Sequence, residues 1–462
     1  MLQCLASEHH SDHVYFLHSE ANSCLEQILP QLKCHFTWNL FKDEDIPEDL
    51  EDRVCEQIES LNPESKGTMY NLLAYIKHLH GQNEAALECL QQAEKSIQKE
   101  HSDQAEVRNL VTWGNYAWVN YHLGKLDEAQ DYVDKVKQVC EKFSNPLSLE
   151  CPELDTEEGW ARLKCGNNQL KRAIVCFEKA LEKHPHDPEF ASGLAFSRHH
   201  ASELAIETHC DSDCPAPVNV FNLLREAVEL NPKNMYVKLL LALTLQKMNN
   251  AEGEKLVEEI LKEGPDEAGV LQQAAKFYRT GGDLDKAIKL LKRASEMLPN
   301  STRIHYIIGT CYREKIQKIF GGHNRMCQES EYLLQHQIEQ GIDHFKKADN
   351  NRNLSQVNLS LAFLHAIAGE YNEAEHYYQR EFSKDLSPLQ KQQLHLYYGN
   401  FQSFQMKCEE KAIHHYMEGV KINHASKEKE KMIGKLYTIA KKRHFENRQD
   451  SQTLELLEFL QL

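Results

Sequence analysis

The chain has 462 residues, of which 41% are hydrophobic and 27% charged, and this composition excludes an intrinsically disordered protein. Its formal net charge of −17 argues against nucleic-acid binding by the surface as a whole, but it is compatible with a local basic groove. No apolar run approaches the roughly 18 residues that a membrane-spanning helix needs. The N-terminal residues also lack the basic and apolar regions of a signal peptide. We therefore expect a cytoplasmic protein that contacts no membrane.

Fourteen cysteines are scattered along the chain. In a long chain without a signal peptide, they are expected to be mostly buried free thiols rather than a disulfide framework. His209, Cys210 and Cys214 form the one group with a spacing like that of metal ligands, and no second pair follows nearby. The group is either a zinc site or a pair of thiols in a loop. The loop is favoured, so we expect no metal and no cofactor.

Residues 1–24 are polar and rich in histidine, and they predict a loosely ordered N-terminal extension. The sequences LEQILPQLKCHFTWNLF (25–41) and DLEDRVCEQIESL (49–61) follow. Their apolar residues recur three or four positions apart, which predicts two amphipathic helices separated by residues 42–47.

The stretch 269–299 predicts two helices joined by a turn. Gly281 and Gly282 interrupt the helical pattern, and Pro299 ends the second helix. On either side of the glycines, small and large apolar residues lie three or four positions apart: Leu271, Ala274, Ala275, Tyr278, Ala287, Leu291 and Ala294. This is the pattern of a tetratricopeptide repeat of about 34 residues. Because one such hairpin cannot bury its apolar face alone, it predicts neighbours.

Similar units recur along most of the chain. They begin near Tyr70, Trp113, Trp160, Leu194, Tyr236, Leu271, Ile308, Leu361 and Tyr398. The predicted fold is therefore all-α, a tetratricopeptide-repeat superhelix (a solenoid) of about nine helical hairpins plus capping helices. We expect four parts: the extension 1–24, an N-terminal superhelix 25–232, central repeats 233–350, and C-terminal repeats with basic capping helices, 351–462.

Two segments interrupt the repeats, residues 202–217 and a long insert at 313–340. Compact domains rarely contain loops longer than about 12–15 residues without a reason, so these segments are predicted to mark bends, pivots or partner contacts.

The run from Lys421 to Arg448 contains nine lysines or arginines and three glutamates. It is interpreted first as a solvated helix face and second as a contact for an anionic ligand. Enzyme motifs such as GxxxxGK[ST], HExxH and GxSxG are missing from the sequence, and Glu157–Glu158 is interpreted as an ordinary pair of helix-face charges. We expect no enzymatic activity.

Several strings resemble one family closely. They are CHFTWNL (34–40), NLLAYIKHL (71–79), GQNEAALECL (81–90), LVTWGNYAWV (110–119), CFEKALE (176–182) and AAKFYR (274–279). They resemble the interferon-induced proteins with tetratricopeptide repeats, and the resemblance runs from about residue 25 to residue 448. Residues 399–423 are most similar to the second paralogue, and the N-terminal third is also similar to the third.

The resemblance implies an interferon-induced, cytoplasmic antiviral effector of innate immunity without enzymatic activity. It implies a basic inner groove that holds viral or AU-rich RNA, mainly double-stranded, and inhibition of viral expression and translation. It also implies contacts with sibling paralogues and the translation initiation machinery, and a homodimer formed by helix exchange.

Candidate phosphate contacts follow from this resemblance and from the repeat pattern, which presents cations on the first helix of each hairpin. These first-helix cations are Arg198, Lys238, Lys276, Arg279, Arg313 and Lys315. Tyr278 and Tyr312 lie among them, and core packing is favoured over base stacking for both. The four tryptophans, at positions 38, 113, 118 and 160, are also interpreted as packing residues.

The chain departs from the family pattern at several cations. Thr280 and Gly281 stand where relatives continue KFYR with two more cations, residues 199–202 replace Tyr-Arg-Leu-Asp, and Thr244 replaces a lysine. These changes predict a weaker groove, or a contact shifted to the C-terminal cations Lys431, Lys435, Lys441, Lys442 and Arg443. Arg53, Gln57 and Lys164 match the approximate position of the triphosphate pocket of the first and fifth paralogues, but end-specific binding is not favoured.

Two hypotheses follow. The first is an effector that captures foreign RNA in a basic groove. The second is a scaffold that binds no RNA and assembles paralogues with translation or signalling partners.

Overall fold

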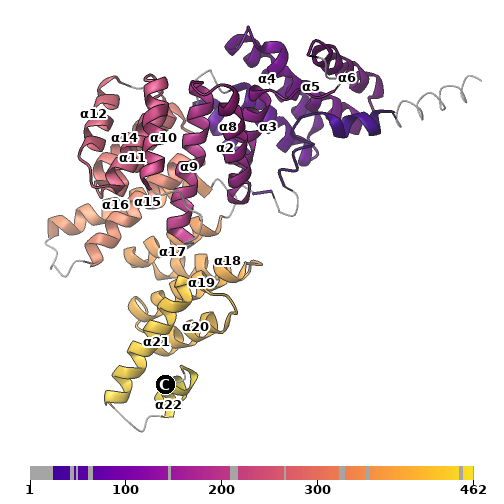
Figure 1. Ribbon diagram of the computed structural model, residues 1–462. Helices are drawn as coiled ribbons and strands as arrows, with labels where there is room; N and C mark the ends of the chain where they lie inside the picture. The colour runs from indigo at the N-terminus through magenta and orange to yellow at the C-terminus, as the bar shows by residue number, and fades with distance from the viewer. Residues whose placement is uncertain are drawn as a thin grey trace, which may run out of the picture. The chain divides into compact units, whose positions relative to one another are not determined.

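The computed structural model describes residues 24–41, 46–47, 50–60, 66–143, 147–208, 217–264, 267–321, 328–349, 354–446 and 451–460. All regular structure within these ranges is helical (Figure 1). The chain divides into two compact units, residues 1–277 (unit 1) and 278–462 (unit 2), and the boundary lies inside one helix, α13 (Ala268–Thr280).

Unit 1 is a succession of helices with short connections. They are η1 Leu29–Gln31, α2 Leu50–Ser60, α3 Lys66–Leu79, α4 Asn83–Glu100, α5 Ala105–His122, α6 Leu126–Glu141, α7 Pro152–Cys165, η3 Asn167–Gln169, α8 Leu170–Lys183, α9 Pro188–Thr208, α10 Pro217–Leu230, α11 Met235–Lys247 and α12 Glu252–Lys262, followed by most of α13. Consecutive helices pack in pairs: α3 with α4, α5 with α6, α7 with α8, α9 with α10 and α11 with α12.

Unit 2 continues the same pattern. Its helices are α14 Leu284–Met297, α15 Thr302–Gly321, α16 Gln328–Asp349, α17 Ser355–Ala368, α18 Tyr371–Phe382, α19 Pro388–Phe404, α20 Glu409–Lys421, α21 Lys427–Glu446 and α22 Ser451–Phe459. Helix α15 pairs with α16, α17 with α18 and α19 with α20, while α21 and α22 close the array. The predicted all-helical repeat fold with helices at its C-terminal end is confirmed.

The small residues of the repeat pattern permit close approach of paired helices. A Cβ atom added at Gly159 on α7 would lie 2.9 Å from the Phe177 ring on α8. At Gly399 on α19 it would lie 2.5 Å from the Tyr416 ring on α20. Both aromatic rings are fully buried. In these two hairpins, a glycine on the first helix therefore makes room for an aromatic side chain of the second, and the two together form the core between the helices.

The first predicted helix, residues 25–41, is largely wrong. A short helical segment leads into η1, and residues 34–41 then form turns. Pro30 within η1 cannot continue an α-helix because it lacks an N–H group and its ring clashes with the preceding turn. Thr37 then competes for backbone groups, since its Oγ1 accepts from the Cys34 N–H at 3.1 Å and donates to the Leu32 carbonyl at 2.7 Å. The second predicted helix is confirmed as α2.

Within the described residues, both predicted inserts are helical. Residues 202–208 extend α9, and residues 209–216 lie outside the described ranges. Most of 313–340 lengthens α15 and α16. The reason is that the apolar stripe continues: Ile316, Leu334 and Ile338 are buried and keep helical spacing with the repeat residues. The extension 1–24 lies outside the described ranges except for Cys24. The four-part division stays a prediction.

None of the described helices has the length and apolar composition needed to cross a bilayer.

Candidate functional site

The first-helix cations do lie on the first helices of hairpins: Arg198 on α9, Lys238 on α11, Lys276 and Arg279 on α13, and Arg313 and Lys315 on α15. What differs from expectation is their environment. Arg198 Nη2 lies 2.5 Å from Glu178 Oε1. Lys276 Nζ donates to both carboxylate oxygens of Glu203, at 3.1 and 3.2 Å. In unit 1, these two cations are therefore already bound to carboxylates.

The same holds for two cations of unit 2. The Arg279 guanidinium binds the Glu314 carboxylate through Nε at 3.1 Å and Nη2 at 2.5 Å. That hydrogen bond is the main reason why the pKa of Arg279 is raised. Lys315 Nζ lies 2.5 Å from Asp285 Oδ1. An incoming phosphate would have to displace a carboxylate from each of these cations, which lowers the net gain from binding.

Arg313 and Lys238 differ from this group. Arg313 Nη1 donates to the hydroxyl of Ser360, a neutral partner, at 2.7 Å. Its Nε is buried without a hydrogen bond to any described residue. Lys238 is half-buried and has no ion pair with a carboxylate in the described ranges. These two charges are not neutralised by a described acidic group.

The C-terminal cations lie on α21. Lys431, Lys441 and Lys442 are exposed and form no ion pair with any residue that the structure describes. Lys435 Nζ lies 5.1 Å from the ring centre of Phe404, and burial lowers its pKa. Arg443 differs, because its Nη2 contacts the carboxylates of both Glu409 and Glu410, at 2.6 and 2.7 Å. Three of the five cations are thus open to solvent and to an anionic ligand.

The aromatic side chains named in the sequence pack into the core. Tyr278 and Tyr312 are 6% and 7% exposed, which confirms core packing over base stacking for both. Trp38 is buried, and Trp113, Trp118 and Trp160 pack against the same core of unit 1. The packing interpretation of the tryptophans is therefore also confirmed.

The region that matches the triphosphate pocket of the first and fifth paralogues, where end-specific binding is not favoured, contains one more arginine, Arg162, than the sequence comparison named. Lys164 Nζ lies 5.9 Å from the Trp160 ring. Burial raises the pKa of Cys165 to about 12, and Arg162 and Arg53 partly oppose this shift, which places both near that thiol. Arg162 has a structural task, since it donates to Gln169 Oε1 at 2.6 Å and to the Trp38 carbonyl at 2.9 Å. It thereby holds the non-helical turn segment against α7.

A buried polar network in unit 1 was missed by sequence reasoning. Asn71 Nδ2 on α3 donates to Thr112 Oγ1 at 3.0 Å and to Glu157 Oε1 at 2.7 Å. Arg108 on α5 binds Glu189 on α9, with an Nη2 to Oε2 distance of 2.8 Å. Side chains from α3, α5, α7 and α9 are therefore joined by polar contacts.

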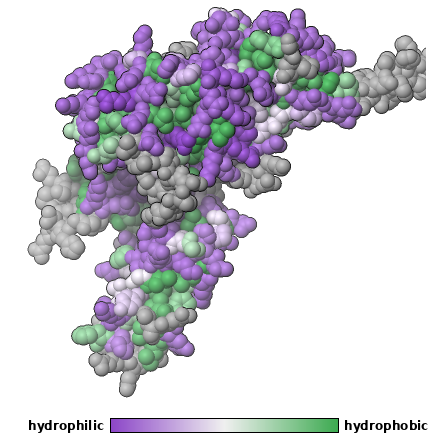
Figure 2. All heavy atoms as spheres, viewed as in Figure 1, coloured by the Kyte–Doolittle hydropathy of each residue, from purple (hydrophilic) through white to green (hydrophobic). Residues whose placement is uncertain are grey.

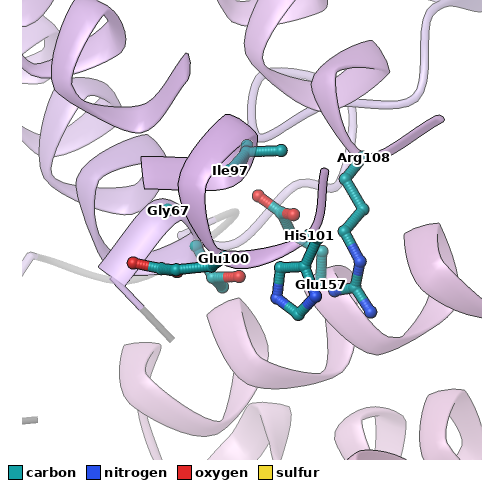
Figure 3. Close-up of a pocket in the computed structure, with 7 residues that line it drawn as sticks. Gly67, Ile97, Glu100, His101, Arg108 and Glu157 are labelled. Carbon is teal, nitrogen blue, oxygen red and sulfur yellow. The ribbon is translucent and has the colours of Figure 1, made fainter. Parts of the chain in front are cut away.

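The interpretation of Glu157 as an ordinary helix-face charge is wrong, because its side chain is buried, with 5% exposed. It lies beside a small cavity with Glu100, His101 and Arg108 (Figure 3). Burial raises the pKa of Glu157 to about 7, against the opposing effects of Asn71 and Arg108. A signal was present: Glu157 lies three residues after Leu154 and four before Ala161, both buried, so it falls on the inner stripe of α7.

The described cysteines are free thiols, and all except Cys24 are buried or half-buried, as expected. No group of three or more histidine, cysteine or acidic side chains within the described ranges could hold a metal ion. His209, Cys210 and Cys214 lie outside those ranges, so the choice between a zinc site and a loop stays open.

Known relatives cover almost the whole chain. It is 55% identical over 450 residues to "Interferon-induced protein with tetratricopeptide repeats 2" of Homo sapiens, covering 96% of this chain and 93% of that protein. It is 45% identical over 396 residues to "Interferon-induced protein with tetratricopeptide repeats 3" of Mus musculus, covering 85% and 94%. The "Antiviral innate immune response effector IFIT1" of Homo sapiens is 43% identical over 442 residues, covering 94% and 91%. No protein-family model matches the chain.

Solved structures are similar over the same length. An IFIT1 monomeric mutant (L457E/L464E) with Gppp-AAAA aligns with a TM-score of 0.77 and 40% identity, covering 94% of this chain and 95% of that chain. The human IFIT1 dimer with PPP-AAAA aligns with a TM-score of 0.72 and 39% identity, covering 94% of each. At this identity and coverage, the likeness extends beyond a shared repeat.

Proposed function

This chain belongs to the family of interferon-induced proteins with tetratricopeptide repeats, and on that premise we propose that it is an interferon-induced antiviral effector of innate immunity that binds viral or AU-rich RNA. The observation that carries the proposal is the whole-chain likeness to IFIT1 structures that hold capped or triphosphate RNA. We propose that it acts by binding rather than by catalysis, and that it does so in the cytoplasm.

The proposed RNA contacts are the open cations. Lys431, Lys441 and Lys442 on α21 present three positive charges to solvent within twelve residues, and none of them is paired with a carboxylate among the described residues. Arg313 and Lys238 add charges on first helices. Each phosphate that these groups neutralise releases counterions from the RNA, so binding is expected to depend steeply on salt. The cations already bound to carboxylates, including Lys276 and Arg279, contribute less.

Double-stranded RNA suits such contacts, because it is recognised mainly through its backbone and shape. An effector bound to viral transcripts, or to translation initiation factors, would keep those transcripts from being expressed. The proposed assembly includes a homodimer formed by helix exchange and complexes with sibling paralogues. The IFIT1 dimer structures support self-association in the family.

A second candidate, a scaffold that binds no RNA, is favoured by a specific surface. Large apolar side chains are exposed along α19 to α21 and the turn after α19: Tyr397, Phe404, Met406, Ile433, Tyr437 and Phe445. Hydrophobic residues reach the surface over this C-terminal part in Figure 2. Such a patch is typical of protein–protein contacts. The carboxylate-bound first-helix cations also fit this alternative.

The test is RNA retention by the purified full-length chain at two salt concentrations. The probes are an AU-rich duplex, a GC-rich duplex and a 5′-triphosphate single strand. Binding that weakens steeply with salt, and is strongest for the AU-rich duplex, supports the effector. No binding even at low salt, with paralogue complexes intact, would instead establish the scaffold.

A further inference from the structure

Glu203 lies at the centre of a cluster of basic side chains from three helices of unit 1. On its own helix, α9, His199 Nε2 lies 3.7 Å from Glu203 Oε1. Lys247 on α11 reaches the same oxygen at 3.3 Å, and Lys276 on α13 contacts both oxygens. One carboxylate thus takes two ammonium groups that come from two successive first helices.

The electrostatic balance of the cluster is positive. Burial alone would raise the pKa of Glu203, but Lys276, His199 and Lys247 lower it to about 2, so the carboxylate is fully ionised at neutral pH. Burial lowers the pKa of His199 to about 4, so its ring is neutral there. Two ammonium groups against one carboxylate leave a net positive charge.

His199 lies beside the Glu203 carboxylate but forms no hydrogen bond with it. Its side chain is 4% exposed, and its Nε2 is buried without a hydrogen bond to any described residue. The ring is oriented through its other nitrogen, since Nδ1 lies 3.3 Å from the Thr244 hydroxyl. That hydroxyl donates to the Leu240 carbonyl at 3.0 Å, so it accepts from Nδ1–H. In the neutral ring Nε2 therefore carries no hydrogen, so His199 is held beside Glu203 but supplies no hydrogen-bond donor for an anion.

The lysines remain reachable from solvent. Their side chains are 38% and 44% exposed, whereas that of Glu203 is 23% exposed. The arginine of the structural pair Arg108–Glu189 is only 9% exposed, by comparison. An anion can thus approach Lys247 and Lys276 from outside without unpacking a helix.

We propose that Lys247 and Lys276 form a phosphate-binding site for the RNA backbone, and that Glu203 occupies this site as an internal competitor. A phosphodiester has the same unit charge as the carboxylate and can accept from both lysines. Because Glu203 is attached to the same unit, it acts at a high effective concentration, and RNA must displace it. The inference rests on the proposed function, and it specifies which carboxylate competes with RNA for two of the cations.

The experiment compares wild type with Glu203→Gln in the full-length chain. The amide keeps the shape of the carboxylate and removes its charge. We expect RNA affinity to rise roughly tenfold at low salt, equal to about 1.4 kcal/mol. The plot of log affinity against log salt concentration should become steeper by about 1 to 2, as expected for one or two additional phosphate contacts. The double variant Glu203→Gln/Lys276→Gln should return affinity to the wild-type value. Thermal unfolding of each variant establishes that it is folded.

The matched control is Glu106→Gln, which makes the same charge change at an exposed pair with Lys142. Equal gains in the control and in Glu203→Gln would overturn the site, because the effect would then follow net charge. A second probe, inorganic pyrophosphate measured by calorimetry, separates the two proposals. If no protein binds RNA but Glu203→Gln alone binds pyrophosphate, the site stands and the proposed function fails. If wild type binds RNA and Glu203→Gln gains affinity for neither probe, the site fails and the function stands.

Discussion

Four cations of the first helices and three lysines of α21 use the same residue types in opposite ways. Arg198, Lys276, Arg279 and Lys315 each lie within 2.5 to 3.2 Å of a carboxylate oxygen. Lys431, Lys441 and Lys442 on α21 face solvent with no carboxylate partner among the described residues. The first group ties helices together, while the second remains available to a ligand.

The difference teaches that a cation in a family motif is not the same as a charge available for binding. An overall charge of −17 supplies many carboxylates, and the packing of neighbouring helices places four of them, Glu178, Glu203, Asp285 and Glu314, beside the motif cations. On α21, Lys431, Lys441 and Lys442 have no carboxylate partner among the described residues, although the helix itself contains Glu428, Glu430 and Glu446. The availability of a cation depends on its neighbours in three dimensions.

Removing three charges from each group gives the largest expected contrast. The variant Lys431→Gln/Lys441→Gln/Lys442→Gln should bind RNA roughly 50-fold more weakly at low salt, and its salt slope should fall by about 2 to 3. The matched variant Arg198→Gln/Arg279→Gln/Lys315→Gln should lose less than about fivefold, since these cations are already neutralised. Fluorescence anisotropy at several salt concentrations measures both. Equal losses would remove the distinction between the groups.

Glu157 is a carboxylate to which the same rule applies. The nearby Arg108 is bound to Glu189, and no described cation forms an ion pair with Glu157. Its pKa in the folded protein, about 7, lies above its usual value. Its contribution to stability is therefore complete below the unfolded pKa and is lost as pH rises through about 7.

The variant Glu157→Gln should consequently match wild type near pH 5 and be more stable by about 2 kcal/mol at pH 8. Asn71 can still donate to the amide oxygen, so packing is kept. Urea unfolding at the two pH values measures the effect. A difference that does not change with pH would show that Glu157 is not protonated in the folded chain.

Arg313 is the first-helix cation with a neutral partner, Ser360, and it should break the pattern of its group. We expect Arg313→Gln to weaken RNA binding about fivefold, more than Arg279→Gln, because no carboxylate has to be displaced. Binding titrations of the two single variants decide between them. If Arg279→Gln weakens RNA binding more than Arg313→Gln does, the ion pair with Glu314 does not reduce the contribution of Arg279 to RNA binding.

The smallest expected effect is a gain. Glu314→Gln releases Arg279 and should raise RNA affinity about twofold to threefold, which corresponds to an exposed or partly exposed ion pair. The same change should lower the free energy of unfolding by less than about 1 kcal/mol. Anisotropy and thermal unfolding measure the two consequences. A loss of affinity on this substitution would mean that Glu314 positions Arg279 for the ligand.

Much of the fold was predictable because the repeat pattern is local. Leu271, Ala274 and Tyr278 lie at helical spacing, and the structure buries all three. The errors have local physical causes too. Pro30 and Thr37 ended a helix whose apolar spacing continued, and the buried Ile316 and Ile338 continued helices where a loop was expected.

The candidate site was predicted less completely. The helices that carry Lys276, Arg279 and Lys431 were correct, but their partners lie far away in sequence: Glu203 is 73 residues before Lys276. Ion pairs between different hairpins leave no periodic signal. His199 and Glu203 share a face of α9 at a spacing of four residues, which was the one local clue to the cluster.

The sequence alone determined that the chain forms helical hairpins, which residues fill their cores, and which family it resembles, because helix periodicity and turn residues act over a few positions. Only the tertiary structure decided which charges are free. Stacking the hairpins brings carboxylates such as Glu178, Glu203 and Glu314 against the motif cations, buries Glu157 and leaves Lys431, Lys441 and Lys442 in solvent. Coulomb interactions depend on distance in space, and that distance is set by packing rather than by position in the chain.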